Sequence, residues 1–292
     1  MQPNEEWFIQ WVVGMTDGNG SFSILRKGDS DKWNLTFKIS QSTYNLRGLY
    51  YIKKKLGVGS VSVESNRTGA YFIVRDRITL GSVIIPIFDK YPLLTTKYFY
   101  YNNFKQAYTI LENKNFTNNQ KNELLEKISL NSNIPSKDYI SPAWNKFNIK
   151  VDNTYTKVIA KPWLIGFVEA EGSFYFIKNK ISNIDKISQL ITPLRAEFRL
   201  AQNNNFFLLN KIKEKLKISR KVSLLGKSTN HFYIVAASTL SLQNVINFYT
   251  NPNIVKFKGE KFLQFILWLK GIKNIVRHNK VKIPVSYGGD SS

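Results

Sequence analysis

Two short stretches of this sequence place side-chain oxygen groups directly after an apolar segment. They read WVVGMTDGNGSF at residues 11–22 and WLIGFVEAEGSF at residues 163–174, and each ends in acidic or amide residues followed by Gly-Ser-Phe. Carboxylate and amide oxygens are the ligands that hard divalent cations prefer. The pair therefore favours metal chemistry built on oxygen ligands.

The remaining composition excludes other kinds of metal or redox site. The chain has no cysteine, which excludes disulfides, iron–sulfur clusters and thiolate zinc sites. With only His231 and His278, it also lacks the residues for histidine-dependent nuclease motifs or His-rich metal sites. We therefore expect any metal to be of the Mg²⁺ type.

The charge balance indicates a polyanionic partner. Lysine and arginine number 42 against 20 acidic residues, which gives a net charge of +22. Nucleic acid is the leading partner, and a merely solubilising basic surface is the alternative. The sequence has no apolar run of about 18 residues, and its start does not resemble a signal or transit peptide, so no membrane is expected.

The two stretches belong to a longer internal repeat, in which residues 7–111 match residues 159–271. The other matched pairs are FKISQ at 37–41 with FRLAQ at 198–202, IKKKL at 52–56 with IKEKL at 212–216, YFIV at 71–74 with FYIV at 232–235, and Lys97 with Lys258. The constant order predicts two similar domains related by a pseudo-twofold axis. The predicted parts are an N-terminal domain over 1–112, a linker over 113–158, a C-terminal domain over 159–284 and a flexible tail over 285–292.

Each half shows the same succession of periodicities. Trp33, Leu35, Phe37 and Ile39 alternate with polar residues, which predicts a strand with one apolar face. A helix over 46–56 should end at Gly57, a hairpin should turn at NRTG (66–69), and helices should cover 79–89 and 95–111. The fold class is therefore α+β, with two α-β-β-α-β-β-α domains that each carry an antiparallel sheet backed by helices. Within the linker, 120–130 predicts a short helix, with Trp144 and Phe147 as anchors.

The polar sides of the predicted strands mix basic, amide, hydroxyl and acidic groups, as base-edge readout in a major groove requires. An ordinary solvated sheet face is the alternative. The candidate DNA-binding residues are Ser23, Arg26, Lys32, Asn34, Thr36, Lys38, Arg67, Tyr71, Arg75 and Arg77 in the first half, and Tyr175, Lys178, Lys180, Arg195, Glu197, Arg199, Lys221, Ser223, Lys227, Thr229, His231 and Tyr233 in the second.

Small residues in the paired stretches suggest how the site is assembled. Gly14 and Gly18 lie four apart, as do Gly166 and Ala170, so the two helices could pack closely against each other. Their last polar residues, Asn19 and Glu171, would then lie side by side. Asp17 and Glu169 precede these by two positions and project about 200° away, so we expect them to hydrogen-bond or form salt bridges at the flanks of the helix interface.

The repeat supplies further candidate catalytic residues in pairs. Two carboxylates at a twofold axis facing DNA would hold divalent cations shared with the scissile phosphates. Gln41 and Gln202 are candidates for ordering water, and Lys97 and Lys258 for neutralising the transition state. Generic phosphate contact is the alternative role for the lysines.

The two stretches, in register with the strands and the Gln and Lys pairs, resemble the LAGLIDADG homing endonucleases in their single-chain, two-motif form. The resemblance implies two saddle-shaped sheets astride a long asymmetric double-stranded DNA target, bound by a monomer with no obligate protein partner. It implies cleavage of both strands across the minor groove with Mg²⁺, for which Ca²⁺ or Mn²⁺ can substitute. It further implies an intron-encoded, mitochondrial protein.

Carried onto this chain, the metal-binding acid of the motif falls on Glu171 in one copy and on Asn19 in the other, with Gly18 and Ala170 beside them. An amide lacks the negative charge of a carboxylate, so cleavage should be impaired. Asn19 could mark a binder or maturase that has lost cleavage, a substitution that traps uncleaved DNA, or an enzyme with slow or single-strand cleavage. The alternative function is an RNA maturase that assists splicing of its host group I intron; a transcriptional regulator is a third reading.

Overall fold

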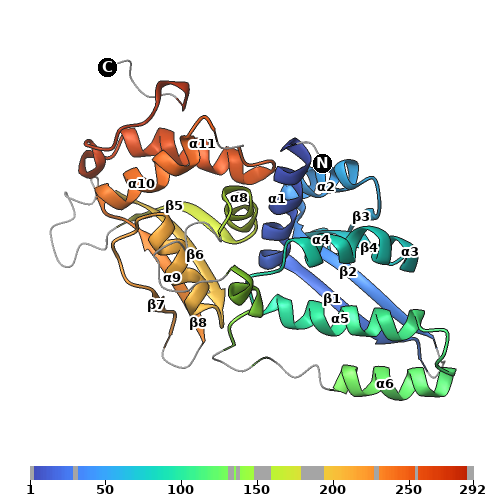
Figure 1. Cartoon of the computed structure of the whole chain (residues 1–292). Coiled ribbons are helices and arrows are strands. Elements are labelled where there is room, and N and C mark those ends of the chain that lie inside the picture. The colour runs from blue at the N-terminus through green and yellow to red at the C-terminus, as the bar shows by residue number, and fades with distance from the viewer. Residues whose placement is uncertain are drawn as a thin grey trace. The chain divides into compact units, whose positions relative to one another are not determined.

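The computed structural model describes residues 3–28, 32–130, 135, 139–147, 159–178, 194–226, 230–253 and 256–287 (Figure 1). Packing divides the chain into two compact units, Met1–Ala170 and Glu171–Ser292. The division falls later than the predicted domain start at 159, because the second motif helix packs with the first unit. Each unit is described in turn.

The first unit follows the predicted order of helices and strands. Its elements are α1 (Pro3–Asn19), β1 (Gly20–Arg26), β2 (Trp33–Ser42), a 3₁₀ turn (Thr43–Asn45), α2 (Leu46–Leu56), β3 (Ser60–Val63), β4 (Gly69–Val74), α3 (Arg77–Thr79), a π-helical turn (Leu80–Ile84), α4 (Ile85–Lys90), α5 (Lys97–Glu112), α6 (Asn118–Leu130), a 3₁₀ turn (Pro142–Phe147) and α8 (Lys161–Glu171), of which residues up to Ala170 belong to this unit. Helix α2 ends as predicted, because Gly57 adopts a left-handed φ of 71° and its N–H donates to the Lys53 carbonyl.

The first sheet has the strand order β1-β2-β4-β3, with all neighbours antiparallel. The alternation predicted for β2 is confirmed: Leu35, Phe37 and Ile39 are buried, whereas Asn34 is exposed and Thr36 and Lys38 are partly exposed. Helices α4 and α5 cover the apolar side. There the Phe22 ring lies 5.4 Å from both Tyr101 and Phe104 of α5, and this aromatic contact fixes the helix on the sheet.

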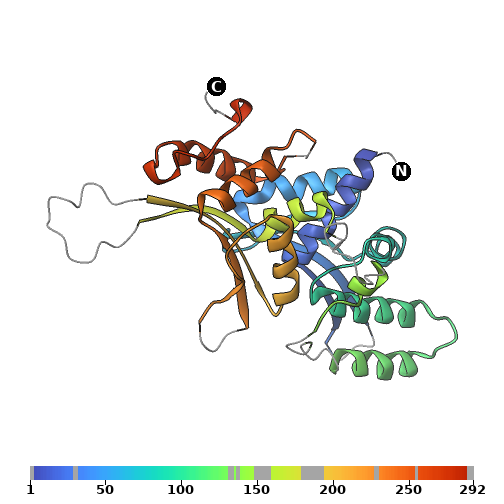
Figure 2. The same cartoon turned by 60° about the vertical axis from the view of Figure 1, so that its left-hand side comes forward.

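The second unit repeats the plan. Its elements are β5 (Gly172–Lys178), β6 (Leu194–Asn203), α9 (Phe206–Lys215), β7 (Ser223–Leu224), β8 (His231–Ala236), α10 (Thr239–Thr250), α11 (Glu260–Lys273) and 3₁₀ turns at Val276–His278 and Val285–Tyr287. The strand order is β5-β6-β8-β7, and Figure 2 shows β5 and β6 side by side. Phe174 lies 5.1 Å from both Phe265 and Trp268 of α11, the counterpart of the Phe22 cluster.

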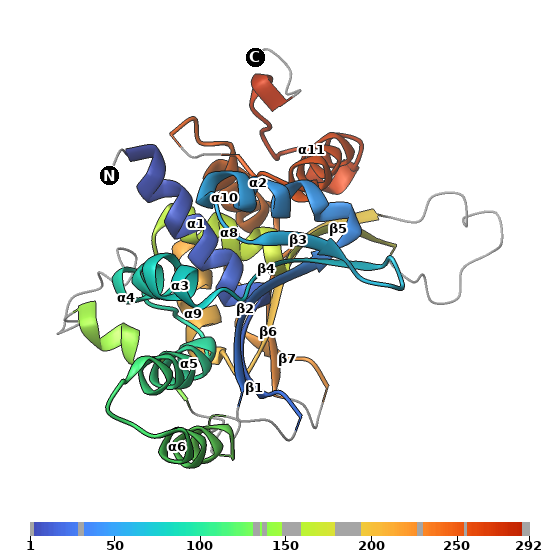
Figure 3. The same ribbon diagram turned by 90° about the vertical axis from the view of Figure 1, so that its right-hand side faces the viewer.

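The predicted linker contains ordered structure that belongs to the first unit. The short helix is confirmed as α6, which lies beside α5 (Figure 3). Asn122 of α6 accepts a hydrogen bond from the Trp33 indole at 2.9 Å, which ties α6 to the start of β2. Trp144 is confirmed as an anchor, since its side chain is buried and its indole donates to the Leu94 carbonyl oxygen at 3.1 Å.

Strand pairing corrects the register of the repeat in one strand. Ser40 pairs with Tyr71 in the first sheet, and Ala201 pairs with Tyr233 in the second. Since FKISQ and FRLAQ do correspond, Tyr71 is equivalent to Tyr233 and not to Phe232 as the sequence match predicts. The match was wrong by one residue because both registers align aromatic and aliphatic residues with one another, so the sequence does not separate them. A one-residue slip exchanges the two faces of a strand.

Candidate active site and nucleic-acid interface

The two motif helices make an unusually close backbone contact within the first unit. A Cβ atom added to Gly14 would collide with the carbonyl oxygen of Trp163, and one added to Gly166 would collide with the carbonyl oxygen of Trp11. The contact is thus reciprocal between α1 and α8. The predicted role of these two glycines, close approach of the helix backbones, is confirmed.

A pair of tryptophan–carboxylate hydrogen bonds reinforces this packing. The Trp11 indole donates to Glu169 at 3.0 Å, and the Trp163 indole donates to Asp17 at 2.8 Å. Both carboxyl groups are buried. The prediction that Asp17 and Glu169 hydrogen-bond within the interface is confirmed.

Asp17 also fastens the first unit's loop before α5. It accepts hydrogen bonds from the Leu94 N–H at 2.9 Å and from the Thr95 N–H and hydroxyl at 3.0 and 2.6 Å. Burial raises the pKa of Asp17, and the hydrogen bonds from Leu94, Thr95 and Trp163 oppose that rise only in part. Its carboxylate therefore serves as a structural acceptor.

The residues at the ends of the motif helices lie as follows. Asn19 ends α1, is half-buried, and donates through Nδ2 to the Ala170 carbonyl oxygen at 3.3 Å. This contact leaves the Asn19 amide oxygen as its atom for binding a cation. Gly18 is buried, and Glu171 ends α8 half-buried. Oxygen donors of this kind fit Mg²⁺ or Ca²⁺. That Asn19 and Glu171 lie side by side stays a prediction.

In each unit a lysine contacts the glycine that directly follows a motif helix. Lys97, at the start of α5, donates to the Gly20 carbonyl oxygen at 2.6 Å, and Lys261, in the first turn of α11, donates to the Gly172 carbonyl oxygen at 2.5 Å. The counterpart of Lys97 is therefore Lys261, and the predicted pairing with Lys258 was wrong. Lys258 lies in the loop before α11.

Aromatic spacing in the sequence does not distinguish Lys261 from Lys258. Tyr101 and Phe104 follow Lys97 at four and seven positions; Phe265 and Trp268 follow Lys261 at that spacing, and Phe262 and Phe265 follow Lys258 at the same spacing. In the structure, Tyr101 and Phe104 contact Phe22, and Phe265 and Trp268 contact Phe174. Only the ring contacts and the lysine hydrogen bonds in the structure identify Lys261 as the counterpart of Lys97.

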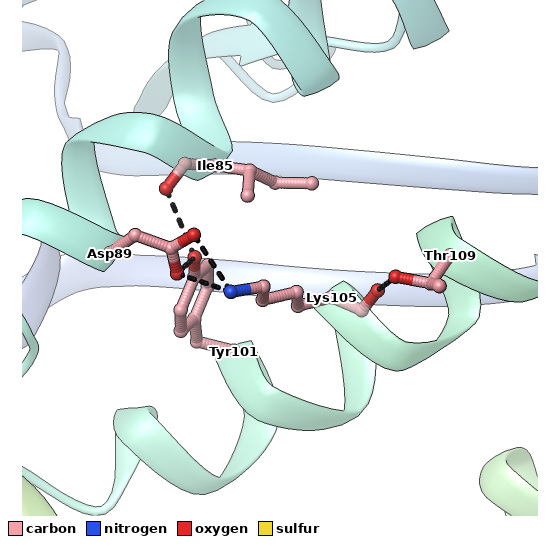
Figure 4. A network of polar contacts seen from close by, with 5 residues as sticks. All are labelled: Ile85, Asp89, Tyr101, Lys105 and Thr109. Carbon is pink, nitrogen blue, oxygen red and sulfur yellow. Dashed lines mark hydrogen bonds and ion pairs between the residues drawn. The ribbon is translucent and has the colours of Figure 1, made fainter. Parts of the chain in front are cut away.

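A polar network holds α5, and with it Lys97, against α4 (Figure 4). The Tyr101 hydroxyl donates to Asp89 at 2.7 Å and lies 3.0 Å from the Ile85 carbonyl oxygen, and Lys105 contacts both Asp89 oxygens at 2.8 and 2.7 Å. Burial is the largest cause that raises the pKa of Tyr101, followed by its hydrogen bond to Asp89. Tyr101 thus takes part both in the polar network around Asp89 and, through its ring, in the aromatic core with Phe22.

The two glutamines lie near the ends of equivalent strands. Gln41 pairs with Ala70, and Gln202 pairs with Phe232. The Gln41 amide oxygen accepts a hydrogen bond from Asn45 at 3.1 Å. Both glutamines are half-buried, and their role in ordering water stays a prediction.

The polar face of the first sheet gathers part of its predicted set. Ser23, Asn34, Thr36 and Lys38 lie on β1 and β2, and the Lys38 ammonium lies 4.9 Å from the centre of the Tyr71 ring. Other members lie elsewhere. Arg26, at the end of β1, is paired with Glu126 of α6 at 2.5 Å; Lys32 precedes β2, and Arg67 lies in the turn between β3 and β4.

Arg75 and Arg77 do not lie on the sheet as predicted, since β4 ends at Val74. Arg77 begins α3 and is 3.5 Å from Glu112. The structural reason is the Asp76 carboxylate, which caps α3 by accepting from the Thr79 N–H at 2.8 Å.

The polar face of the second sheet contains a connected group of side chains. Tyr175, Arg195, Glu197, Arg199 and Tyr233 lie on β5, β6 and β8. Glu197, predicted to point outward, is only 3% exposed because Arg195 and Tyr175 cover it. Of the remaining predicted residues, Ser223 lies on β7, His231 on β8, Lys178 ends β5 and Lys221 precedes β7; Lys180, Lys227 and Thr229 lie outside the described residues.

Two features are absent from the residues that the structure describes. No helix there is both long and apolar enough to cross a membrane. No group of three or more His, Asp or Glu side chains in those ranges is arranged to hold a metal ion.

The chain is similar to known proteins over most of its length. The family model for "LAGLIDADG endonuclease" matches residues 12–108 and 164–272. "Probable intron-encoded endonuclease Cox1-I1b" of Schizosaccharomyces pombe is 38% identical over 93% of this chain, and "Probable intron-encoded endonuclease 4" of Neurospora crassa is 27% identical over 94%. The chain spans 65% and 42% of the length of these two relatives.

Solved structures show the same fold. I-SmaMI, solved "bound to uncleaved DNA target in the presence of Calcium ions", has a TM-score of 0.72 at 23% identity, covering 93% of this chain and 92% of its own. I-GzeII, solved "in complex with DNA target", has a TM-score of 0.70 at 22% identity, covering 96% and 94%. With both motifs, both sheets and the helix pair accounted for, the chain belongs to the LAGLIDADG endonuclease family.

Proposed function

We propose that this chain binds a long asymmetric double-stranded DNA target as a monomer and cleaves both strands at a defined sequence. The observation that supports this most directly is the duplicated lysine contact, Lys97 on Gly20 and Lys261 on Gly172, at the residue directly after each motif helix. One such lysine per unit provides a cation for the chemistry on each of two strands. The net charge of +22 supplies the general affinity for DNA.

The proposed roles follow from the chemistry of each group. Glu171 and Asn19 supply metal-binding oxygens, with the Gly18 and Ala170 carbonyl groups as further donors; Mg²⁺ is the proposed ion. A bound divalent cation would activate water and stabilise the leaving oxygen. Gln41 and Gln202 orient that water, and Lys97 and Lys261 neutralise charge that develops at the phosphate. Lys258 contacts the DNA backbone.

Asn19 makes the two halves of the site unequal. Its amide oxygen can bind a cation but carries no charge, and its Nδ2 is engaged by Ala170. Glu171 brings a full negative charge. We therefore expect weaker metal binding at Asn19, slow double-strand cleavage and an excess of nicked product.

The test is Asn19→Asp assayed on the DNA site formed when the encoding intron is absent. With Mg²⁺, the variant should make double-strand breaks at least about tenfold faster than the natural chain. Glu171→Gln is the matched loss-of-charge control and should abolish cleavage while leaving binding in Ca²⁺ intact. An Asn19→Asp protein that binds this site tightly yet never cuts it would rule out the endonuclease function.

A second candidate function, assistance to splicing of the host group I intron RNA, rests on another basic surface. No acidic residue occurs between Glu260 and Asp290, and Lys270, Lys273, Arg277, Lys280 and Lys282 are exposed. They lie on and after α11, which packs on the apolar side of its sheet, opposite the polar face. A splicing assay on the intron transcript, with and without protein, tests it: an unchanged rate removes this function.

The intron-encoded relatives favour a mitochondrial location, testable by fractionation.

A further inference from the structure

We propose that Glu197 is a positioning residue: it makes no contact with DNA itself, and it holds Arg195 in one orientation from which Arg195 selects guanine in the target. The proposal rests on the sequence-specific DNA binding proposed above. Guanine is the chemistry that fits, because its major-groove edge offers two acceptors, N7 and O6, which match the N–H fork of a guanidinium group.

The Glu197 carboxylate is enclosed by two partners on its own sheet face. Arg195 Nη2 lies 2.5 Å from one carboxylate oxygen, and the Tyr175 hydroxyl donates to the other at 2.8 Å. Tyr175 stands directly opposite Glu197 in the β5–β6 pairing, and Arg195 lies two residues before it on β6. The whole residue is 3% exposed, so the carboxylate is shielded from solvent although it lies on the polar face of the sheet.

This enclosure is incompatible with base reading by Glu197. A carboxylate that reads cytosine must present a free oxygen to the amino group of the base. Here one oxygen accepts a hydrogen bond from Tyr175, the other is in ion-pair contact with Arg195 without hydrogen-bond geometry, and the side chain is buried. An exposed carboxylate would also be repelled by DNA phosphates, and the ion pair with Arg195 removes that repulsion.

Arg195 is ion-paired with Glu197 and still partly exposed. The ion pair involves Nη2 and the Nε atom is buried, but the side chain is 29% exposed, which leaves N–H groups at the end of the guanidinium for a partner above the sheet. A long arginine side chain loses rotamer freedom when it binds; fixing it in advance reduces that loss and sharpens the geometry of the contact. Ion pairing by Glu197 therefore converts a flexible phosphate binder into an oriented reader of one base.

A second pair of side chains lies on the same sheet face. The Arg199 guanidinium lies over the Tyr233 ring, 4.2 Å from its centre. This pair and the Arg195–Glu197–Tyr175 group come from the three strands β5, β6 and β8. Because Tyr175 already donates to Glu197, its hydroxyl can only accept from a base, which restricts it to a supporting role.

The equivalent positions of the first unit lack this device. Strand pairing makes Ser23, Thr36 and Asn34 the counterparts of Tyr175, Glu197 and Arg195. None of these three residues makes a side-chain hydrogen bond or ion pair with any of the residues that the structure describes. A fixed reader of guanine is therefore a property of the second unit, and the half of the target that this unit reads should show the stricter preference.

The test is selection of DNA from a library of duplexes randomised across the target, in Ca²⁺, by the natural chain, Glu197→Gln and Arg195→Lys. Glutamine keeps the shape and an acceptor for Tyr175 but removes the ion pair. We expect both variants to lose preference for guanine at the same single base pair, by about tenfold or more, with other positions unchanged. Glu214→Gln, which removes the exposed pairing with Lys211 on α9, is the matched control and should leave every preference intact.

Each other outcome decides against the idea in a recognisable way. If Glu197→Gln changes a different base pair from Arg195→Lys, Glu197 reads DNA directly. If it lowers selection evenly at all positions together with the melting temperature, its role is structural only. If the unsubstituted chain selects no sequence at all, the proposed DNA function itself is overturned. If the unsubstituted chain does select a sequence and Glu197→Gln selects the same one with the same base preferences, only this inference is overturned.

Discussion

The polar faces of the two sheets share one frame but carry different chemistry. Both contain a cation over an aromatic ring at equivalent positions, Lys38 over Tyr71 and Arg199 over Tyr233. Next to that common pair, the first face has separate small polar side chains and the second has the connected Arg195–Glu197–Tyr175 group. Duplication has kept the contacts that shape the sheet and changed the groups that would meet the target.

The two motif helices show the same division between scaffold and chemistry. Gly14 and Gly166, and the two tryptophan–carboxylate bonds, are reciprocal. The terminal residues Asn19 and Glu171 are not alike in charge. If the comparison is right, changes to the reciprocal contacts should damage stability in both copies, whereas changes at the unequal positions should affect activity or specificity.

The largest expected effect is on the close approach of α1 and α8. Gly14→Ala and Gly166→Ala should each lower the free energy of unfolding by more than about 3 kcal/mol, since the added Cβ meets a backbone carbonyl that cannot rotate away. Urea titration measures this. Gly81→Ala is the control, because the atoms nearest its added Cβ are the hydroxyl and ring edge of the Tyr108 side chain, which can move, and not a backbone carbonyl. Equal, mild effects at all three sites would contradict the reciprocal contact.

The second expected effect concerns the lysines that the structure pairs. Lys97→Met and Lys261→Met in the Asn19→Asp background should each slow cleavage about 100-fold, the size expected for loss of one charge-stabilising group. Lys258→Met should have a much smaller effect, seen mainly as weaker binding at high salt. Single-turnover cleavage with binding in Ca²⁺ separates the two. A larger loss at Lys258 than at Lys261 would restore the pairing expected from sequence.

The sequence predicted the architecture well because its signals are local or repeated. Alternation in β2, the cap at Gly57 and the motif glycines each depend on a few neighbouring residues. The errors arose where three-dimensional pairing decides: the shift between Tyr71 and Tyr233 and the substitution of Lys261 for Lys258. Alternation places Glu197 on the polar side but says nothing of side chains that cover it.

A third, smaller effect compares how much the two buried motif acids, Asp17 and Glu169, contribute to the free energy of unfolding. Asp17 joins α1, α8 and the loop before α5, so Asp17→Asn should lower the free energy of unfolding by about 2 kcal/mol more than Glu169→Gln. Burial raises the pKa of Asp17, so between 3.8 and that higher value the folded chain holds more protons than the unfolded chain. Stability due to Asp17 therefore falls as pH rises through this window, and Asp17→Asn should remove that fall.

Urea titrations at several pH values measure both quantities. Glu169→Gln serves as the matched control, since it also replaces a buried motif carboxyl group by an amide. Equal losses of stability in the two variants would show that the extra hydrogen bonds of Asp17 add nothing.

The smallest expected effect is an acid sensitivity confined to the second unit, because both histidines of the chain lie there. His278 is buried, and its Nε2 accepts from the Ala196 N–H of β6 at 3.2 Å. Burial, and then the charges of Arg277 and Arg195, lower the pKa of His278 from 6.5. As pH falls below 6.5, the unfolded chain takes up a proton that folded His278 resists, so stability present above 6.5 is lost.

Hydrogen exchange resolved by segment tests this against the first unit as internal reference. Lowering the pH through 6.5 should increase opening of β6, after correction for the intrinsic pH dependence of exchange, and should not increase opening of β2, since protonation of Asp17 stabilises the first unit. His278→Gln keeps an acceptor for Ala196 without the titration, so it should remove the increase. His231→Gln, on the polar side of β8, should not. If β2 and β6 opened together, the two units would share one acid-sensitive transition, and the difference in chemistry between the sheets would have no counterpart in their stability.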